Sequence, residues 1–334
     1  MKKVFIVTGA NGFLGNNIIR KLSEANEVRA LILPNDKNNI LKDMNCKIYY
    51  GDVTKPETLN EIFCTQADEE LYVIHCAAIV YIKSKYNPNV YNVNVNGTKN
   101  IIQKVLEKNA KLIYVSSVHA ITEKPNKELI TEIRDFNPDA VIGYYAKTKA
   151  EIAKYVLKMV EEKNLNACIV HPSGIIGPND YSSTHLTQLL LDYANNKLTA
   201  CVKGGYDFVD VRDVADGIIK ACEYGQKGEC YILSNRYMTV KELLDIASEI
   251  LKIKKINTIL PMWFARLTAP LSELYYSFVK RPPLYTKYSL YTLTSNSNFS
   301  NLKAKKELNY TTRDMKETVR DTIQWLEKEK KIKS

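Results

Sequence analysis

Tyr145 and Lys149 form a pair that could carry out proton transfer. They lie four residues apart in the segment GYYAKTK (143–149), so on a helix their side chains share one face, one turn apart. A phenol has a pKa of about 10 and is a poor acid–base catalyst at neutral pH unless its surroundings tune it. A nearby ammonium favours the phenolate and lowers that pKa. Such a tyrosine can protonate a carbonyl oxygen as hydride reaches the carbon, or deprotonate an alcohol in reverse. The spacing alone fits a solvated helix face equally well.

Ser117 could assist this pair. It ends the apolar run KLIYVSS (111–117), which is typical of a buried strand. Ligands of open α/β sheets bind at the carboxyl ends of the strands, and a serine hydroxyl there can hydrogen-bond a substrate oxygen. A serine that caps a turn is the alternative.

A glycine-rich loop follows the first apolar run. Gly9, Gly12 and Gly15 lie in TGANGFLG (8–15), directly after a predicted strand and at the start of a predicted helix. In this setting the first glycine permits a tight turn, the second lets the backbone approach a pyrophosphate, and the third lets helix and sheet pack closely. The free N–H groups at the helix N-terminus then face the phosphates. The loop predicts a dinucleotide site.

Residues that follow the second and third predicted strands could bind the adenosine half of the dinucleotide. Asp36 and Lys37 lie a few residues after the second strand, where an acid binds the ribose hydroxyls of NAD and a basic group accepts the 2′-phosphate of NADP. The choice between NAD and NADP stays open. Asp52, with Val53 beside it, follows the third strand and can contact the adenine ring, although an aspartate in a turn explains it too.

The elements that position these residues alternate between strand and helix. Strands are predicted at 4–9, 28–33, 46–53, 71–78, 111–117 and 166–173, and helices at 13–25, 56–67, 92–109 and 144–163. Continuous apolar strands between helices indicate a Rossmann-type, doubly wound parallel sheet. The second half is less regular, with helices at 185–197, 213–224, 239–252 and 314–330 and short strands at 199–202, 207–211 and 229–233. We expect a dinucleotide-binding domain over 1–175, to which parts of 205–235 return. Residues 176–334 would form most of a smaller, substrate-binding C-terminal lobe.

Composition narrows the class further. The 334 residues are 45% hydrophobic and carry a net charge of +10. The basic residues are spread along the chain and form no long run of like charge. We therefore expect no nucleic-acid partner. The seven cysteines form no CxxC pair, which suggests reduced thiols in a cytoplasmic protein and no metal site. No signal peptide and no transmembrane segment are predicted.

Motifs along nearly the whole chain carry a family resemblance. They are TGANGFLG, GDVT (51–54), HCAA (75–78), NVNGT (94–98), YVSS (114–117), YYAKTKAE (144–151), HPSGIIGP (171–178), FVDVRDVADG (208–217), and KAKKELNY (303–310) before a helix with Trp325. In order and spacing the chain resembles extended short-chain dehydrogenases/reductases of the NAD-dependent epimerase/dehydratase family. VRAL, HPSGIIGP and RPPLYT (281–286) look closer to the branch of dihydroflavonol and aldehyde reductases.

The resemblance implies roles for individual residues. Ser117, Tyr145 and Lys149 match the family's catalytic triad, and Lys149 would also hold the nicotinamide ribose. The residues that would bind the cofactor are Gly9, Asn11, Gly12, Phe13, Leu14, Gly15, Asp36, Asp52, Val53, Ala77, Ala78, Tyr145, Lys149, Pro172 and Ile175. Within this set, the loop residues would hold the pyrophosphate, Ala77 and Ala78 would line the cleft, and Pro172 and Ile175 would lie against the nicotinamide. Asn94 is expected to be structural.

Two departures from the family pattern bear on the reaction. Val118 and His119 follow Ser117, where the 4,6-dehydratases carry an Asp-Glu pair. Tyr206 and Asp207 precede Phe208, where nucleotide-sugar epimerases commonly place an arginine for the substrate diphosphate. We therefore expect an NAD(P)-dependent enzyme that reduces an aldehyde or ketone, or oxidises the alcohol. A nucleotide-sugar epimerase with tightly bound NAD and a non-catalytic NAD(P) sensor are the alternatives.

Other features allow more than one reading. His119 could touch the small-molecule carbonyl or sugar substrate or cap a turn, and His171 is expected to be structural. The apolar segment 261–280 could roof the substrate pocket, pack on the core or rest on a membrane. The helices at 92–109 and 144–163 could form a homodimer contact.

Overall fold

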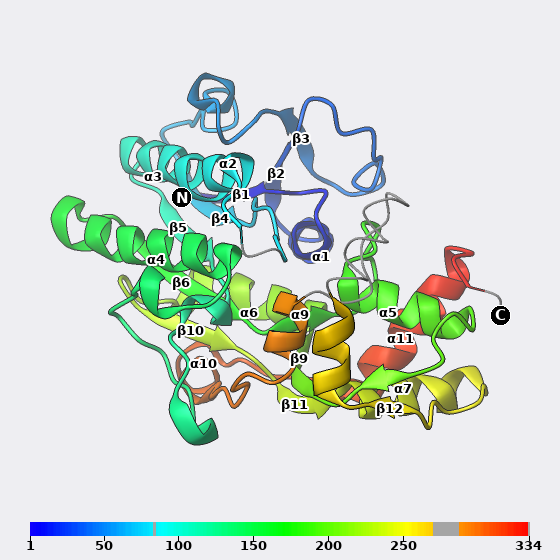
Figure 1. The fold of residues 1–334 in the computed structure, drawn as a ribbon. Coiled ribbons are helices and arrows are strands. Elements are labelled where there is room, and N and C mark those ends of the chain that lie inside the picture. The colour runs from blue at the N-terminus through cyan, green and yellow to red at the C-terminus, as the bar shows by residue number, and fades with distance from the viewer. Residues whose placement is uncertain (83–84, 270–286, 333–334) are drawn as a thin grey trace.

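Seven parallel strands form the main sheet of the computed structural model, which describes residues 1–82, 85–269 and 287–332. In order across the sheet these strands are β10 (Cys230–Leu233), β6 (Ala167–Pro172), β5 (Lys111–Val115), β4 (Glu69–His75), β1 (Lys2–Thr8), β2 (Glu27–Ile32) and β3 (Lys47–Tyr50). The order runs outward from β1 in both directions, which places a topological switch point between β1 and β4. The predicted doubly wound parallel sheet is confirmed (Figure 1).

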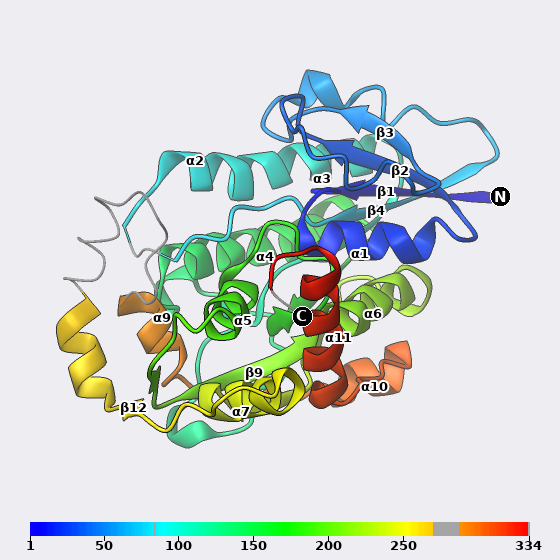
Figure 2. The same ribbon diagram turned by 90° about the vertical axis from the view of Figure 1, so that its right-hand side faces the viewer.

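Both faces of this sheet are buried, as its apolar strands predict. Along β1, Val4 and Ile6 face one hydrophobic cluster, whereas Phe5 and Val7 face another. The first cluster includes apolar residues of α3 (Thr98–Glu107) and α4 (Tyr144–Lys163), and the second includes those of α1 (Phe13–Leu22) and α6 (Val211–Tyr224). Figure 2 shows α1 and α3 on opposite sides of the sheet. Such two-sided burial positions the carboxyl ends of the strands rigidly.

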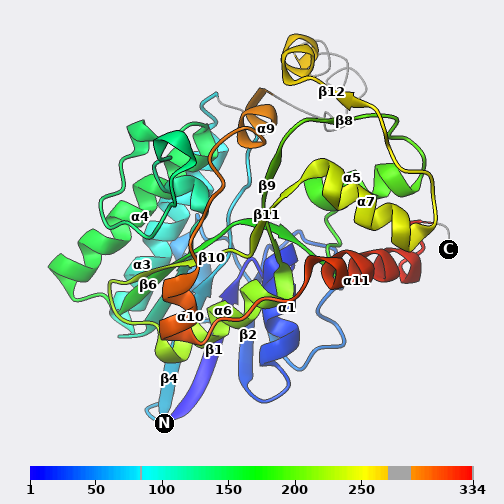
Figure 3. The same ribbon diagram turned by 90° about the horizontal axis from the view of Figure 1, so that it is seen from below.

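The second half of the chain adds two small sheets and a group of helices. The sheets have the strand orders β11–β9–β7 and β12–β8. Their strands are β7 (Gly174–Ile176), β8 (Cys201–Val202), β9 (Gly205–Asp210), β11 (Arg236–Thr239) and β12 (Ile259–Leu260). The helices are α5 (His185–Ala194), α7 (Val240–Leu251), α9 (Lys287–Thr292), α10 (Leu302–Leu308) and α11 (Met315–Lys328). In Figure 3, α5, α7 and α11 lie together to one side of the main sheet.

One predicted helix is wrong. Residues 56–67 form only a short 3₁₀ turn, Pro56–Leu59, followed by irregular chain. The hydroxyl of Thr58 donates to the carbonyl oxygen of Lys55 at 2.7 Å and also accepts from the N–H of Asp52 at 3.0 Å. Such side-chain bonds to the local backbone compete with helical bonding.

The helix predicted at 92–109 is more complex than its periodicity suggests. A short helix α2 (Pro88–Tyr91) leads into a π-helical segment, Asn92–Gly97, before α3 begins. Within that segment, the Asn94 amide bonds both backbone groups of Ile79: its oxygen accepts at 2.7 Å and its nitrogen donates at 3.1 Å. Asn94 therefore fixes the chain that follows β4, which agrees with the structural role expected for it.

The structure describes the apolar segment at 261–280 only up to residue 269. Residues 270–280, and RPPLYT after them, lie outside the described residues. Residues 262–269 are helical, and Trp263 and Leu267 are each 68% exposed there. Among the helices that the structure describes, none combines the length and the apolar character needed to cross a bilayer.

The junction of β9 and α6 is held by a buried carboxylate. Asp210 is fully buried and accepts from the Arg212 backbone at 2.7 Å and from its Nε and Nη2 at 3.0 and 2.8 Å. Arg212 also donates to Asp321 of α11 at 2.7 Å. Asp210 thus caps the start of α6, and Arg212 ties α6 to α11.

We predict that Asp210→Ala lowers the free energy of unfolding by about 3–5 kcal/mol, because it leaves the Arg212 guanidinium partly buried without its main partner. Urea unfolding would measure this change. Asp139→Ala is the matched control, since the Asp139 side chain is 92% exposed, and it should cost less than about 1 kcal/mol. Equal effects of the two substitutions would contradict the prediction.

Candidate active site

The glycine loop is shaped to bring backbone close to a ligand. Gly9 has φ +65° and lies so near the end of β4 that a Cβ would fall 2.8 Å from the Ala77 nitrogen. A Cβ on Gly15 would fall 2.2 Å from the Gly9 carbonyl oxygen. The remaining glycine, Gly12, is the N-cap residue of α1, and no side chain bonds the first N–H groups of this helix. Its first N–H groups thus remain available for an anion, and the loop fits the pyrophosphate of a dinucleotide.

A hydrogen-bonded pair connects this loop with the end of β2. Asn11 Nδ2 donates to Asp36 Oδ2 at 2.9 Å, and the other oxygen of Asp36 accepts from the Asn38 N–H at 3.0 Å. The amide oxygen of Asn11 is buried and has no partner. The two residues therefore present acceptors, which suit the hydroxyls of a ribose.

The other predicted cofactor residues lie along the same edge of the sheet or close to it. Asp52 Oδ1 accepts from both the N–H and the hydroxyl of Thr54, at 2.9 and 2.8 Å, so it also stabilises a turn. Val53 packs against Gly97, where a Cβ would lie 2.6 Å from its methyl group. Phe13 and Leu14 lie at the start of α1, and Ala78 follows β4. Pro172 ends β6, and Ile175 lies within β7.

The predicted catalytic residues come from two neighbouring elements. Ser117 follows β5, and its hydroxyl oxygen accepts from the His119 N–H at 3.2 Å. Tyr145 and Lys149 lie in the first two turns of α4, which directly follows Gly143 with its φ of +101°. The Lys149 ammonium donates to the carbonyl oxygen of Val115, the last residue of β5, at 2.7 Å. All three side chains of the predicted triad are buried.

Burial dominates the proton affinities of this pair. It raises the pKa of Tyr145, and nearby Tyr288 adds to the rise, whereas a hydrogen bond with Ser117 lowers it. Burial also lowers the pKa of Lys149 to about 8. We expected the ammonium to lower the pKa of Tyr145. In the structure the ammonium instead contacts the Val115 carbonyl and lies 5.9 Å from the centre of the Tyr145 ring. The phenol therefore stays protonated at neutral pH.

His171 contacts the backbone of Ser117, just after the end of β5. It is fully buried, stacks on Phe136, and its Nδ1 lies 3.0 Å from the carbonyl oxygen of Ser117. Burial lowers its pKa to about 4, so the imidazole is neutral at neutral pH. This geometry agrees with a structural role, because the ring positions the backbone of Ser117.

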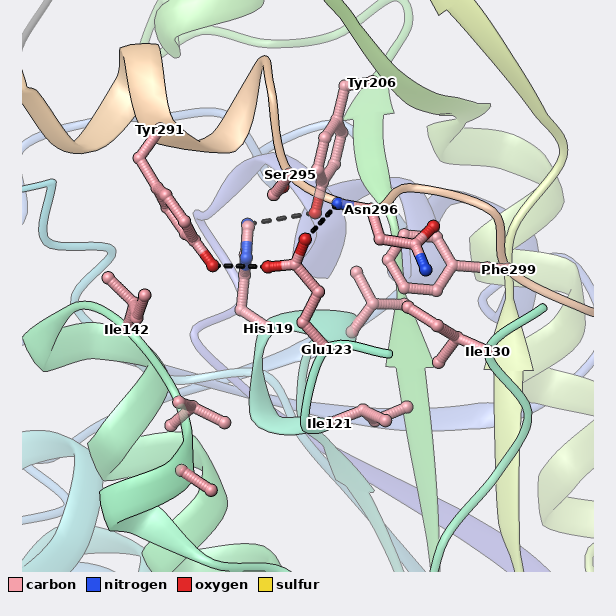
Figure 4. A pocket seen from close by; sticks show the side chains of 13 residues that line it. His119, Ile121, Glu123, Ile130, Ile142, Tyr206, Tyr291, Ser295, Asn296 and Phe299 are labelled. Carbon is pink, nitrogen blue, oxygen red and sulfur yellow. Dashed lines mark hydrogen bonds between the residues drawn. The ribbon is translucent and has the colours of Figure 1, made fainter. Parts of the chain in front are cut away.

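A pocket of about 120 Å³ opens at the loop that follows Ser117 (Figure 4). Its wall combines apolar and polar side chains and consists of Val118, His119, Ile121, Glu123, Ile130, Ala140, Val141, Ile142, Tyr206, Tyr291, Ser295, Asn296 and Phe299. His119 Nε2 lies 3.0 Å from the Tyr206 hydroxyl, and the two rings stack. Because burial lowers the pKa of His119 to about 4, this polar pair is uncharged at neutral pH.

One carboxylate joins the two sides of the pocket: the loop after Ser117, and the roof formed by α9 and the chain that follows it. Glu123 accepts from the Tyr291 hydroxyl and from the Asn296 N–H, each at 2.5 Å. These bonds hold α9 and the chain after it over the loop that follows Ser117 (Figure 4).

Sequence reasoning missed most of this pocket. It considered His119 as a substrate contact and noted Tyr206 only as a position without arginine. Glu123, Tyr288 and Tyr291 belong to no recognised motif, and nothing in their spacing shows that α9 folds back over the triad.

Sheet order and glycine loop together define a dinucleotide-binding protein of the Rossmann class. The chain belongs to the NAD dependent epimerase/dehydratase family, whose model matches residues 5–234. It is therefore an enzyme that uses NAD or NADP and acts on CH–OH or carbonyl groups.

Similar proteins span the full length of the chain. Sterol demethylase protein B of Methylococcus capsulatus is 26% identical over 96% of this chain and 97% of that protein. A Synechocystis protein provisionally named dihydroflavonol 4-reductase is 26% identical over 100% and 97%, respectively. The crystal structure of gox2253 is 32% identical, covers 99% of each chain and has a TM-score of 0.84.

The buried ammonium gives a pH-dependent prediction. Below about pH 8, Lys149 is charged in both the folded and the unfolded chain, so burial of the charge destabilises the fold fully. Between about pH 8 and 10.5 the folded protein loses this proton first, and the penalty disappears. Relative to Lys149→Met, wild type should therefore gain about 3 kcal/mol of stability as pH rises through this window.

Urea unfolding at pH 7.5, 9 and 10 would measure this difference. Lys147→Met is the control on the same helix, because the Lys147 side chain is 45% exposed. Its stability should stay parallel to that of wild type. A Lys149→Met curve parallel to wild type would refute the burial argument.

Proposed function

We propose that this enzyme reduces an aldehyde or ketone with a bound nicotinamide cofactor. The observation that carries the proposal is the Tyr145 phenol: it is buried, stays protonated and lies near Ser117, whose hydroxyl lowers its pKa, at the carboxyl edge of the dinucleotide-binding sheet. A protonated acid at this place suits net reduction, in which the substrate oxygen must gain a proton.

The residues have distinct roles in this reaction. The glycine loop and Lys149 would hold the dinucleotide, which when bound would supply the hydride for the carbonyl carbon. Ser117 and Tyr145 hold the carbonyl oxygen through their hydroxyls, and Tyr145 gives it the proton as negative charge develops. The Lys149 ammonium, which lies on the same helix face and is bonded to the Val115 carbonyl, would have to turn toward Tyr145 to stabilise the phenolate left behind, and it can bond ribose hydroxyls. Solvent then returns a proton to Tyr145.

The wall of the site supports reduction over epimerisation of a nucleotide sugar. At the place where epimerases commonly carry an arginine for the diphosphate, the Asp207 carboxylate is buried and accepts from the Ser173 hydroxyl at 2.5 Å. Tyr206 beside it is paired with His119. A neutral pair and an acid are poor ligands for a diphosphate.

We predict that Tyr145→Phe lowers kcat by about 10²-fold or more, because it removes the proton donor. Tyr144→Phe is the matched control, since it removes a neighbouring phenol and should leave turnover within about twofold. Oxidation of NADH or NADPH with a panel of aldehydes and ketones would measure both. Equal activity of the two variants would refute the assignment, and tightly bound NAD with sugar epimerisation but no net oxidation would favour the epimerase.

We also propose that NAD is the preferred cofactor. The Asp36 carboxylate, bonded to Asn11, and the unpartnered Asn11 oxygen present acceptors on the ribose side of the loop. Acceptors bind the two hydroxyls of NAD, whereas the 2′-phosphate of NADP would be repelled.

Asp36→Asn is expected to raise kcat/KM for NADPH relative to NADH by about tenfold or more, because it removes the opposing charge. Steady-state kinetics with both cofactors would measure the ratio. Lys37→Met tests whether Asp36 or Lys37 decides the cofactor. If Asp36 does, this variant should leave the ratio of kcat/KM for NADPH and NADH unchanged. A collapse of NADPH use in Lys37→Met would instead identify a 2′-phosphate site.

A further inference from the structure

Tyr288 carries a buried hydroxyl that the mechanism does not use. It lies on α9, its side chain is 93% buried, and its hydroxyl has no hydrogen-bond partner. The neighbouring phenols differ in this respect. Tyr206 is paired with His119, and Tyr291 with Glu123. An unpartnered buried hydroxyl destabilises a protein, so its presence calls for a partner that arrives later.

The position of this hydroxyl is next to the proposed chemistry. The phenol end of Tyr288 packs on Gly143, where a Cβ would lie 2.2 Å from Cε2 and 2.7 Å from Cζ. Gly143 precedes Tyr145 by two residues, and Tyr288 contributes to the raised pKa of the Tyr145 phenol. The Tyr288 ring also lies 6.1 Å from the ring of His119, which lines the pocket.

Both the backbone and the roof hold Tyr288 at this place. Only a glycine at 143 leaves room for the ring, and its φ of +101° also favours glycine. Through Tyr291, Glu123 anchors the helix that carries Tyr288. These two restraints fix the ring, and its hydroxyl is preorganised to donate rather than free to rotate into solvent.

We propose that Tyr288 donates a hydrogen bond to a second oxygen of the substrate, adjacent to the carbonyl that Tyr145 protonates. In the nearby pocket the pair of His119 and Tyr206 is neutral, and the Glu123 carboxylate is already bonded. The preferred substrate is therefore an uncharged carbonyl compound with an oxygen substituent on the neighbouring carbon. This inference rests on the proposed function, because it takes Tyr145 as the residue that meets the reacting oxygen.

A binding experiment tests the role of Tyr288 without turnover. The complex with NADH is titrated with 1-phenyl-1,2-ethanediol and with 1-phenylethanol, which differ by one hydroxyl and cannot be oxidised by the reduced cofactor. Wild type should bind the diol about tenfold more tightly, the effect of one buried hydrogen bond. Tyr288→Phe should bind the two alcohols equally.

Tyr310→Phe is the matched control. Its phenol is also buried without a partner, but it packs with the cluster that includes α6, away from the triad. It should keep the wild-type preference. Thermal unfolding should show both variants at or above the wild-type Tm, because each loses a buried hydroxyl without a partner. This result would show that loss of the preference in Tyr288→Phe does not come from misfolding.

The outcomes separate this inference from the proposed function. Equal binding of diol and alcohol by wild type, failure of wild type to bind the diol, or a preference that survives in Tyr288→Phe would each overturn the inference. Reduction of 2-hydroxyacetophenone and of acetophenone by NADH and NADPH is measured in parallel. A loss of preference in Tyr288→Phe without turnover of any carbonyl would leave the role of Tyr288 standing and overturn the reductase proposal.

Discussion

The hydrogen bond from Lys149 to the last carbonyl of β5 is the contact on which the site depends. It joins α4 to the end of a central strand, and therefore fixes Tyr145 of the helix against Ser117 of the strand's extension. The bond also places a positive charge where water is excluded, and burial alone lowers the pKa of this ammonium to about 8. The fold thus holds the lysine in place at some cost in stability, as is usual for functional groups.

A second set of contacts closes the site from the other lobe. Glu123 follows the triad strand by a few residues and bonds Tyr291 and Asn296 from a segment more than 160 residues later. The same segment is joined to residue 130 by backbone bonds, from the Ile130 N–H to the Asn298 carbonyl and from the Ser300 N–H to the Ile130 carbonyl. These links make the roof an extension of the dinucleotide-binding half. Changes in the roof therefore act directly on the surroundings of Tyr145.

The sequence predicted the sheet well because each of its strands carries its own signal. Buried parallel strands are continuous apolar runs, and the 20-residue helix α4 matches its predicted range of 144–163. The helix at 56–67 failed because hydroxyl bonds of Thr58 to the local backbone outweighed periodicity. The π-helical segment around Asn94 could not be predicted, since it depends on bonds to Ile79 from another part of the chain. For the site, motifs indicated the glycine loop and the triad residues, whereas the tertiary contacts of Glu123, Tyr288 and Tyr291 left no local trace.

Unsatisfied groups are the part of this molecule that packing alone does not explain. The Asn11 oxygen and the Tyr288 hydroxyl are both buried without partners, and each lies at one end of the expected cofactor and substrate path. Buried polar groups destabilise a fold unless they are bonded, so these two oxygens contribute nothing favourable in the ligand-free protein. Under the proposed function, ligands would supply the missing donor and acceptor. The ligand-free protein would then be less stable than one without these unbonded groups. Ligands with oxygen atoms in matching places would regain that stability on binding, and so would be selected over others.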